Sequence, residues 1–343
     1  MAYGLSSFHY INESRQLNNR AIDWYGRVMD TRKPVDGSAV LLMMVLCATW
    51  GMQQVVLKAT AADIAPVMQI ALRSGVAALL VGLVMWWRGE SMSLRDGTLV
   101  PGLAVGVFFA TEFLLVAEGL RHTSASHMVV FLYTAPIFAA LGLHWRIPAE
   151  RLSGLQWSGI AIAFAGIAMT FLGRGHGAAT DAAATSSTLW GDFLGVLAAI
   201  AWAATTVVVR CSSLAKAQPS KTLQYQLVMA FGVLLCAAWL SGQAQVNFTP
   251  QVWASLAFHA VVVSFASFLA WFWLLRHYLA SRLGVFSFMT PLFGMLFGAW
   301  LLDEPIEAGF LVGAIPVLVG IVLVSAGPWL GQIWADTFKA RTR

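Results

Sequence analysis

Long apolar runs separated by short polar gaps fill most of the chain. After a polar beginning, the runs recur with a length of about 20 residues, which an α-helix rising about 1.5 Å per residue needs to cross a bilayer. The predicted spans are residues 38–57, 66–87, 98–118, 125–145, 154–172, 189–209, 222–240, 250–274, 283–302 and 309–328. The pattern therefore predicts an all-α membrane protein with ten transmembrane helices.

The composition agrees with this pattern and narrows the partners. The chain is 59% hydrophobic and 11% charged, with a mean hydropathy of +0.72, whereas soluble domains carry about 25% charged residues. We therefore expect the lipid bilayer as a partner. The pI of about 9.3 does not indicate a nucleic-acid partner, because the basic residues lie in short gaps between apolar runs, where they orient membrane proteins.

The basic residues also test the number of spans. If the N-terminus is cytoplasmic, ten spans place most of the 21 Lys and Arg residues in cytoplasmic segments. The exceptions are Lys58, Arg121 and Arg174 on the other side, and Arg73 inside a span. This asymmetry favours an even number of spans. We therefore predict a multi-pass protein of the inner, or plasma, membrane with both termini in the cytoplasm.

The second half of the chain repeats the first. Residues 120–126 read LRHTSAS and residues 275–281 read LRHYLAS, and the same offset of 155 residues pairs rarer residue types elsewhere. The matched residues include Phe113 with Phe268, Pro136 with Pro291 and Trp145 with Trp300, and at an offset of 154 Gly159 with Gly313 and Gly166 with Gly320. Each repeat contains five spans. Because five is odd, the second repeat enters the membrane from the opposite side, as in the inverted repeats of many secondary transporters.

These repeats divide the chain. Residues 1–37 form a predicted cytoplasmic polar extension, residues 38–172 the first five-helix repeat and residues 189–328 the second. Residues 173–188, rich in small side chains, form a predicted linker, and residues 329–343 form a cytoplasmic tail.

Several signals occur in an order that resembles a known family. They are Ala48-Thr49-Trp50-Gly51 followed by Lys58, Arg73 in the second span, Ser124-Ala125-Ser126 leading to Pro136, and Ala149-Glu150-Arg151-Leu152 leading to Gly159. Together they resemble the drug/metabolite transporter superfamily, in particular its EamA-domain members with two five-helix repeats. The second repeat departs from this pattern by carrying Trp202-Ala203 in place of Trp-Gly. The resemblance implies export of amino acids or other small metabolites, with sugar or nucleotide-sugar transport in relatives.

Two ionisable side chains inside spans are candidates for the solute path. Glu112 lies in the apolar stretch FFATEFLL, and Arg73 lies in the second span. Counted from the same membrane face, the two lie at nearly equal depth, about 13 Å and about 10 Å along their helices. Charged groups in hydrocarbon are costly and commonly functional. We expect either a direct ion pair or a shared polar cavity, and a purely structural ion pair remains the alternative.

Other side chains are weaker candidates for the same path. Tyr133 and Thr290 lie beside Pro136 and Pro291, where a proline frees a backbone carbonyl and can act as a helix hinge, although a simple kink is the alternative. Trp50, Trp202 and Trp271 can form an aromatic wall for an amphipathic solute or anchor the membrane interface. Ser267 can line a cavity or bond across helices.

No metal, cofactor or catalytic signature accompanies these residues. His122 and His277 have no second His or Cys at ligand spacing, and Cys47, Cys211 and Cys236 are scattered among apolar residues. Close-packing GxxxG pairs, such as Gly102 with Gly106, suggest packing within a monomer, with a weak homodimer as the alternative. We expect no cofactor and no metal.

The inverted repeats predict a secondary transporter that works by alternating access, and the family resemblance implies that it exports amino acids or similar small polar or amphipathic compounds. Uptake of a sugar or another metabolite is the alternative within the same class. A polytopic membrane enzyme is the alternative of another class, and the missing catalytic constellation disfavours it.

Overall fold

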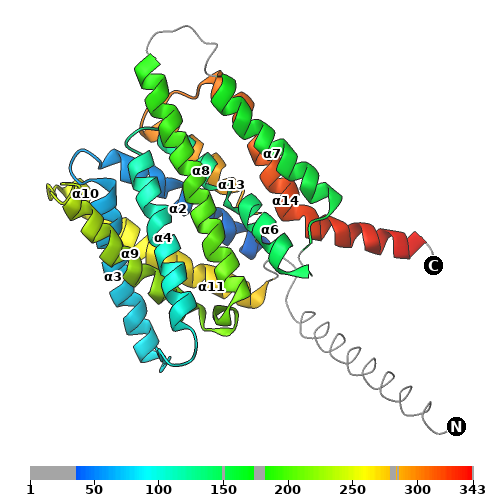
Figure 1. Ribbon diagram of the computed structural model, residues 1–343, viewed down its shortest axis with the longest axis horizontal. Helices are drawn as coiled ribbons and strands as arrows, with labels where there is room; N and C mark the ends of the chain where they lie inside the picture. The colour runs from blue at the N-terminus through cyan, green and yellow to red at the C-terminus, as the bar shows by residue number, and fades with distance from the viewer. Residues whose placement is uncertain (1–35, 149–150, 174–181, 279–282, 284–285, 342–343) are drawn as a thin grey trace.

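Helices build the part of the chain that the structure describes. This computed structural model describes residues 36–148, 151–173, 182–278, 283 and 286–341 (Figure 1). In chain order the elements are α2 (Gly37–Ala59), α3 (Pro66–Trp87), α4 (Leu99–Gly119), α5 (Ala125–Leu132), α6 (Ala135–Arg146), α7 (Gly154–Gly173), α8 (Ala182–Cys211), η3 (Ser213–Lys216), α9 (Pro219–Leu240), α10 (Pro250–Ala257), η4 (Phe258–Ala266), α11 (Ser267–His277), α13 (Met289–Leu301) and α14 (Ala308–Arg341).

The predicted all-α membrane fold is confirmed. Eight helical stretches of the described residues are long and apolar enough to cross a bilayer. Two shorter apolar helices, Gly154–Thr170 within α7 and Met289–Leu301, account for the fifth and ninth predicted spans. Proline opens α3, α9 and α10 at the first turn, where its missing N–H removes no helical hydrogen bond.

Two predicted spans are interrupted. The fourth span breaks into α5 and α6 at Tyr133 and Thr134, and Pro136 sits in the first turn of α6. The repeat-related Pro291 lies in the first turn of α13, after a turn at Ser287 and Phe288. A proline just after a break fits the expectation that it cannot continue the preceding helix. Whether either proline acts as a hinge remains a prediction.

Two helices extend beyond the predicted boundaries. α8 begins at Ala182, inside the predicted linker, with a run of alanines. Alanine has the highest helix propensity of all residue types, so the run favours an earlier start of the helix. α14 continues to Arg341, through most of the predicted tail. The predicted N-terminal extension lies outside the described residues except for its last two residues.

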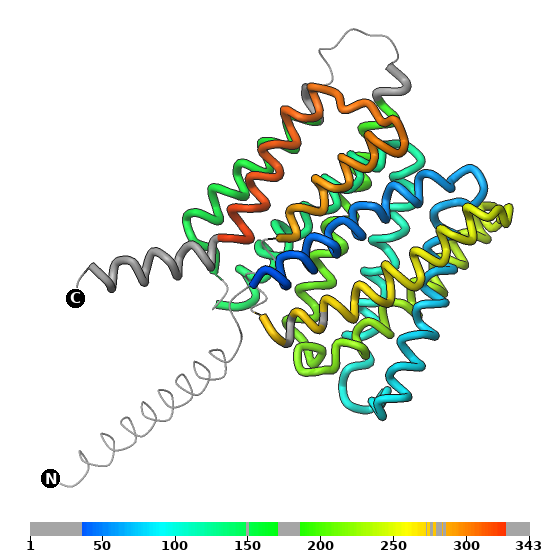
Figure 2. The backbone as a smooth tube through the Cα atoms, turned by 180° about the vertical axis from the view of Figure 1, so that it is seen from behind, coloured from blue at the N-terminus to red at the C-terminus, as the bar shows by residue number. Residues whose placement is uncertain are grey.

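The contact between α7 and α14 reveals the symmetry of the repeats, and both helices lie side by side in Figures 1 and 2. A Cβ on Gly166 would lie 2.6 Å from the carbonyl oxygen of Gly313, and one on Gly159 would lie 3.1 Å from that of Gly320. Gly159 is the repeat partner of Gly313, and Gly166 is that of Gly320. Gly166 therefore packs against the repeat partner of Gly159, and Gly159 packs against the repeat partner of Gly166. A two-fold axis between antiparallel helices requires this exchange.

Other helix pairs exchange in the same way. α2 packs on α13, and its counterpart α8 packs on α6, the counterpart of α13. The central α3 packs along its own counterpart α9. These reciprocal contacts confirm two inverted five-helix repeats. The main hydrophobic core lies between them and includes Phe131, Phe310 and Phe113.

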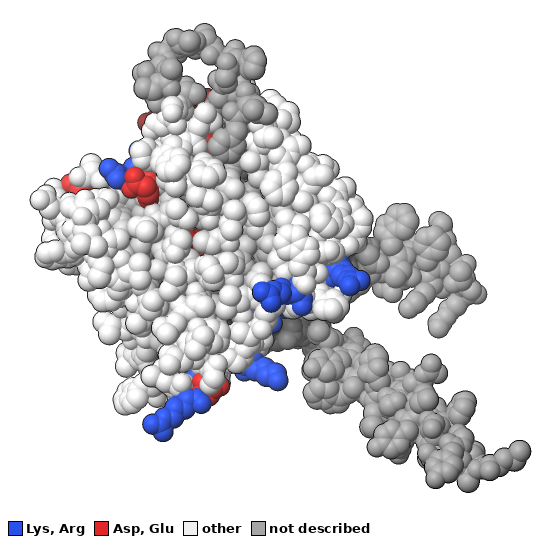
Figure 3. All heavy atoms as spheres, viewed as in Figure 1, with Lys and Arg blue, Asp and Glu red and all other residues white. Residues whose placement is uncertain are grey.

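The two ends of the bundle differ in charge. One end, where α3 ends and α9 begins, carries most of the described basic residues, namely Arg88, Arg95, Arg146, Arg151, Arg210, Lys216 and Lys221. The other end carries Lys58 and Arg121. Figure 3 shows this unequal distribution of Lys and Arg on one face of the molecule. We call the two ends the basic end and the opposite end.

Candidate functional site

Arg73 and Glu112 lie in the interior at the contact of α3 and α4. Their exposed fractions are 3% and 5%. The predicted direct ion pair between them is not formed: Nε and Nη1 of Arg73, and Oε2 of Glu112, have no hydrogen-bond partner within the described residues. The guanidinium carbon of Arg73 instead lies 4.5 Å from the ring centroid of Phe113, the residue after Glu112. Arg73 is therefore held by a cation–π contact that leaves the N–H groups of Nε and Nη1 unused.

Arg73 and Glu112 thus lie near each other without forming an ion pair. The two groups still interact electrostatically. Leaving a buried polar group without a partner costs about 1–3 kcal/mol, and more for charged groups. A protein that keeps such groups in the membrane interior commonly uses them to bind a solute.

The predicted aromatic wall is formed by two tryptophans from different repeats. Trp50 of α2 packs edge-to-face on Trp271 of α11, with ring centroids 5.9 Å apart. The indole N–H of Trp50 donates a hydrogen bond to the hydroxyl of Ser267 at 3.0 Å. Three of the predicted site residues thus meet on one side of the interior.

The remaining predicted residues form a second group. Tyr133, at the end of α5, packs edge-to-face on Trp202 of α8 at a centroid distance of 5.3 Å. Thr290 of α13 is fully buried, and its hydroxyl makes no hydrogen bond of good geometry although the Tyr133 and Cys47 side chains lie beside it. Trp202 therefore does not join the Trp50 wall.

Gly51 explains why the Trp-Gly motif ends in glycine. A Cβ at this position would lie 2.8 Å from the backbone nitrogen of Gly294 and 2.9 Å from the carbonyl oxygen of Thr290. Only a glycine lets α2 cross α13 this closely. The motif thereby holds Trp50 and Thr290 on neighbouring helices.

A buried polar network was missed by the sequence analysis. Thr60 donates to Gln69 Oε1 at 2.9 Å, and Gln69 Nε2 reaches Ser255 and, at 3.3 Å, Nδ1 of His259. His259 Nε2 lies 3.2 Å from the backbone oxygen of Gln53. Gln69 and His259 are both 0% exposed. The network joins α2, α3 and η4 one helical turn from Arg73.

At each end of the π-helix η4, a side chain contacts a backbone carbonyl that would accept a hydrogen bond from an N–H group in an α-helix. His259 Nδ1 lies 2.8 Å from the carbonyl oxygen of Ser255, and Ser267 Oγ donates to that of Val263 at 2.5 Å. Each carbonyl lies four residues earlier and would otherwise accept the α-helical bond. The N–H of Ser267 bonds to Val262 instead, five residues back. The side chains thus favour the wider helix, a feature frequent at functional sites.

Sequence signals for this network existed. His259 is an ionisable residue in the middle of an apolar run, and the same rule that singled out Glu112 applies to it. Gln69 carried no such signal, because neutral amides also bond across membrane helices in purely structural roles.

Bonds between the two repeats close the opposite end. Glu304 Oε1 accepts from the backbone N–H of Ala125 at 2.7 Å, and its Oε2 accepts from the backbone and hydroxyl of Ser126. A carboxylate at a helix N-terminus satisfies free N–H groups and matches the helix dipole. Glu304 therefore ties the α13–α14 connection to the start of α5.

A second tie lies next to the first. His127 Nδ1 lies 3.0 Å from Asp192 Oδ1, and Thr123 donates to the same oxygen at 2.6 Å. The His127 ring stacks on Phe310 with centroids 3.8 Å apart. These contacts bind α5 to α8 and α14, so both ties join the first repeat to the second.

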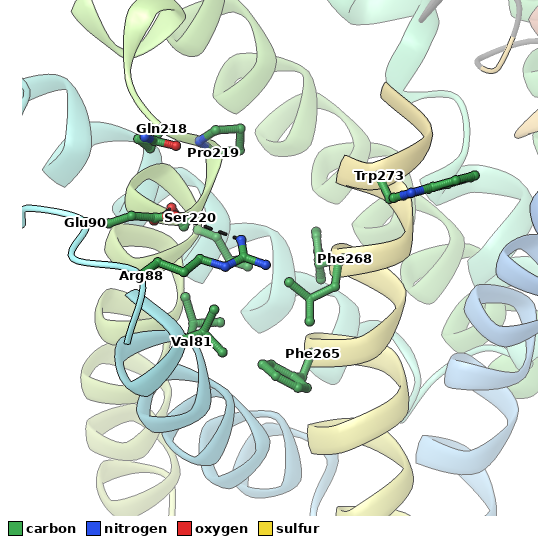
Figure 4. A pocket seen from close by; sticks show the side chains of 12 residues that line it. Val81, Arg88, Glu90, Gln218, Pro219, Ser220, Phe265, Phe268 and Trp273 are labelled. Carbon is green, nitrogen blue, oxygen red and sulfur yellow. Dashed lines mark hydrogen bonds and ion pairs between the residues drawn. The ribbon is translucent and has the colours of Figure 1, made fainter. Parts of the chain in front are cut away.

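The basic end, by contrast, contains a cavity. It lies between α3, α9 and the η4–α11 segment and has a volume of about 370 Å³ (Figure 4). The side chains that line it are Val81, Val84, Arg88, Glu90, Gln218, Pro219, Ser220, Leu223, Phe265, Phe268, Leu269 and Trp273. At the same end, the buried Lys221 lies 2.5 Å from Asp96, and this hydrogen bond lowers the pKa of Asp96 to about 2.

No cluster of three or more His, Cys, Asp or Glu side chains suited to a metal ion occurs among the described residues. The glycines of the predicted Gly102–Gly106 pair pack within the chain: Gly102 faces Tyr225, and Gly106 faces Met229. This packing accounts for these glycines without a partner subunit.

Comparison with known proteins supports a transporter. The EamA-like transporter family matches residues 37–172 and 189–326. A solved crystal structure superposes with a TM-score of 0.58 at 19% sequence identity, covering 83% of this chain and 95% of that one. It shows the same fold.

The relatives are named as transporters. An uncharacterized transporter of Archaeoglobus fulgidus is 25% identical, over 72% of this chain and 83% of its own. A probable amino-acid metabolite efflux pump of Escherichia coli is 23% identical, over 84% of this chain and 94% of its own. An uncharacterized inner membrane transporter of Escherichia coli, YedA, is also 23% identical, over 84% and 90%. Taken with the apolar helices, these matches identify a multi-pass inner membrane protein that moves a small-molecule solute, and the chain belongs to the EamA-like transporter family.

Proposed function

We propose that the protein is a secondary transporter that exports amino acids, with a preference for those that have large apolar side chains. The solute binds in the interior beside Arg73 and Glu112. The two inverted repeats open to either membrane face in turn.

The observation that carries this proposal is the separation of Arg73 from Glu112. A guanidinium with free N–H groups is complementary to a carboxylate, and a carboxylate with a free oxygen is complementary to an ammonium group. An amino acid carries both groups on one carbon atom. An amino acid would give each buried charge a partner and so offset the desolvation cost of Arg73 and Glu112. A sugar carries no charge and would leave that cost in place.

Two further features support the choice of solute. Trp50 and Trp271 present aromatic rings from both repeats, which suit an apolar side chain better than a polar one. One relative is named a probable amino-acid metabolite efflux pump, which supports amino-acid export in general.

Alternating access is supported by the difference between the two ends. Glu304 and Asp192 tie the repeats together at the opposite end, whereas the basic end is hollowed by the cavity beside Phe268. If the basic end faces the cytoplasm, as the distribution of Lys and Arg predicts, this is the conformation in which an exporter loads its solute.

A flux screen in proteoliposomes tests the proposal. Vesicles are loaded with phenylalanine, leucine, alanine, glucose or uridine, and efflux is compared with protein-free vesicles. We expect phenylalanine and leucine to leave fastest and glucose and uridine to stay at the background rate. Efflux of glucose or uridine without any amino acid would reject the proposal.

The Glu112→Gln variant tests the site itself. Its efflux of phenylalanine should fall to near background at every pH between 5.5 and 8.5, a range of about three units around neutrality, because the amide cannot compensate an ammonium charge. Equal amounts of folded protein in the vesicles are the control. A variant that still transports well, and has lost only the pH dependence of the wild type, would instead indicate that Glu112 carries a proton.

A further inference from the structure

The cavity at the basic end has the features of a binding site in its own right. Its volume of about 370 Å³ is within the range of small-molecule pockets, about 300–1,000 Å³. Most of its lining side chains are apolar, including Phe265 and Phe268 from the η4–α11 segment. Figure 4 shows Arg88 reaching from the end of α3 toward Phe268 across this space.

The charges around Arg88 leave its donors available. Glu90 Oε1 lies 3.9 Å from Nη1 of Arg88, which is longer than the roughly 2.7–2.9 Å of a charge-assisted hydrogen bond. The other oxygen of Glu90 accepts a short hydrogen bond from Ser220. Glu90 thus attracts the guanidinium toward the cavity while being held by α9. Within the described residues, the guanidinium of Arg88 donates no hydrogen bond.

The geometry points to a loading site in this cavity, where Arg88 binds the carboxylate of an amphipathic solute while Phe265 and Phe268 contact its apolar part. This inference rests on the proposed function, because it assigns the first contact of the same solute on its way to Arg73. Arg88 directly follows α3, and Arg73 lies fifteen positions earlier in the same helix, a distance of about 22 Å at helical rise. One helix therefore presents two guanidinium groups in sequence along the path.

The available donors of the Arg88 guanidinium favour an occupant with a carboxylate. A carboxylate is charged and can accept two parallel hydrogen bonds from a guanidinium. An amide of the same shape is neutral and cannot form this charged pair. The apolar walls favour a solute whose other end is hydrophobic. 3-Phenylpropionate has both features and lacks the ammonium group that the interior site requires, which makes it a selective probe.

Calorimetric binding of 3-phenylpropionate to the purified protein tests the inference. The Arg73→Gln variant removes the interior arginine, so binding that persists in it reports on the cavity. We expect this binding to weaken about tenfold or more when Arg88→Gln is added, since a hydrogen bond to a charged group is lost. The amide 3-phenylpropanamide should bind neither protein detectably.

Arg95→Gln is the matched control. Arg95 lies in the same connection between α3 and α4, is exposed, and does not line the cavity. It changes the net charge equally and should leave binding of 3-phenylpropionate unchanged. Equal binding with and without Arg88 would overturn the inference.

Flux measurements separate this inference from the proposed function and from a lipid site. If wild type carries no amino acid, the proposed function fails, while the calorimetric experiment still decides whether the cavity binds a carboxylate. In vesicles of phosphatidylcholine alone, Arg88→Gln should raise the KM for phenylalanine offered at the basic end about tenfold and leave kcat unchanged. An effect that appears only when phosphatidylglycerol is added would assign Arg88 to a lipid headgroup and overturn the loading site.

Discussion

Phe113 and Phe268 occupy the same position in the two repeats but lie in different surroundings. Phe113 is buried in the main core beneath Arg73, among side chains of α3, α4 and α9. Phe268 lines the cavity at the basic end, between α3, α9 and α11. In the first repeat, the side chains beside α3 and α9 are therefore packed together around Phe113. In the second repeat, a cavity remains at the equivalent place beside Phe268.

The neighbouring helices show the same difference. α4 packs extensively on α8, whereas η4 and α11, the counterparts of α4, make far fewer contacts with α2, the counterpart of α8. Each repeat thus has a different packing, and the proposed alternating access requires the closed and open packings to be close in free energy. Exchanging them between the repeats would turn a protein open at the basic end into one open at the opposite end.

Access to thiol reagents gives the largest expected contrast. Ala110 and Phe265 are repeat partners at the offset of 155; Ala110 is 1% exposed in the core and Phe265 lines the cavity. In a background without the three native cysteines, we expect Phe265→Cys to react with a charged thiol reagent on the order of a hundredfold faster than Ala110→Cys, which must wait for rare opening. Similar labelling rates would contradict the difference between the two ends.

Truncating the two phenylalanines should have unequal effects on stability. Phe113→Ala removes core packing and the cation–π contact of Arg73, and should cost about 3–5 kcal/mol. Phe268→Ala should cost clearly less, because a side chain beside a cavity has fewer packing partners to lose. Thermal unfolding of both variants in the same detergent measures the difference, and equal losses would argue against an open basic end.

Loosening the closed end should have a smaller effect. Glu304→Gln removes the charge that caps α5, a change of about 1–2 kcal/mol. Reaction of Ala125→Cys with a thiol reagent should then rise about tenfold, because the repeats separate more often. Glu118→Gln is the control, since Glu118 bonds to Arg121 and His122 of its own repeat. If both variants behave alike, Glu304 does not hold the ends together.

The smallest expected effect concerns Asp96 at the basic end. The folded-state pKa of Asp96 is about 2, below the value of an unfolded chain, so its stabilisation is present above about pH 4 and is lost as the pH falls through 2. Asp96→Asn should therefore lower the melting temperature slightly at pH 7, with a difference that shrinks toward pH 2. A difference that grows on acidification would show that another group is responsible.

The fold could be predicted because the bilayer fixes span length and the repeat fixes the order of elements. The offset pairs Gly159 with Gly313 as repeat partners, but it did not predict that Gly159 meets Gly320 in the α7–α14 contact. Pro136 and Pro291 predicted a kink or a hinge within continuous spans, whereas the structure breaks the helix just before each proline. The start of α8 could not be predicted, because small residues suit both linkers and helices.

The candidate site was predicted less well, for a geometric reason. Counting residues from a helix end gives the depth of Arg73 and Glu112, but not the direction in which each side chain leaves its helix. The guanidinium turns toward Phe113, so equal depth did not produce an ion pair. His259 required only the rule already applied to Glu112, whereas the π-helix that presents it depends on hydrogen bonds that only the folded chain displays.

Proteoliposome flux of three molecules that share a phenyl group tests the central claim most directly. Phenylalanine carries a carboxylate and an ammonium group, 3-phenylpropionate lacks the ammonium, and phenethylamine lacks the carboxylate. The interior site predicts that wild type carries phenylalanine at least about tenfold faster than either analogue, since each leaves one buried charge without a partner. Arg73→Gln and Glu112→Gln should each abolish this preference. Equal flux of all three molecules through wild type would contradict the claim that Arg73 and Glu112 bind the two charged groups of the solute.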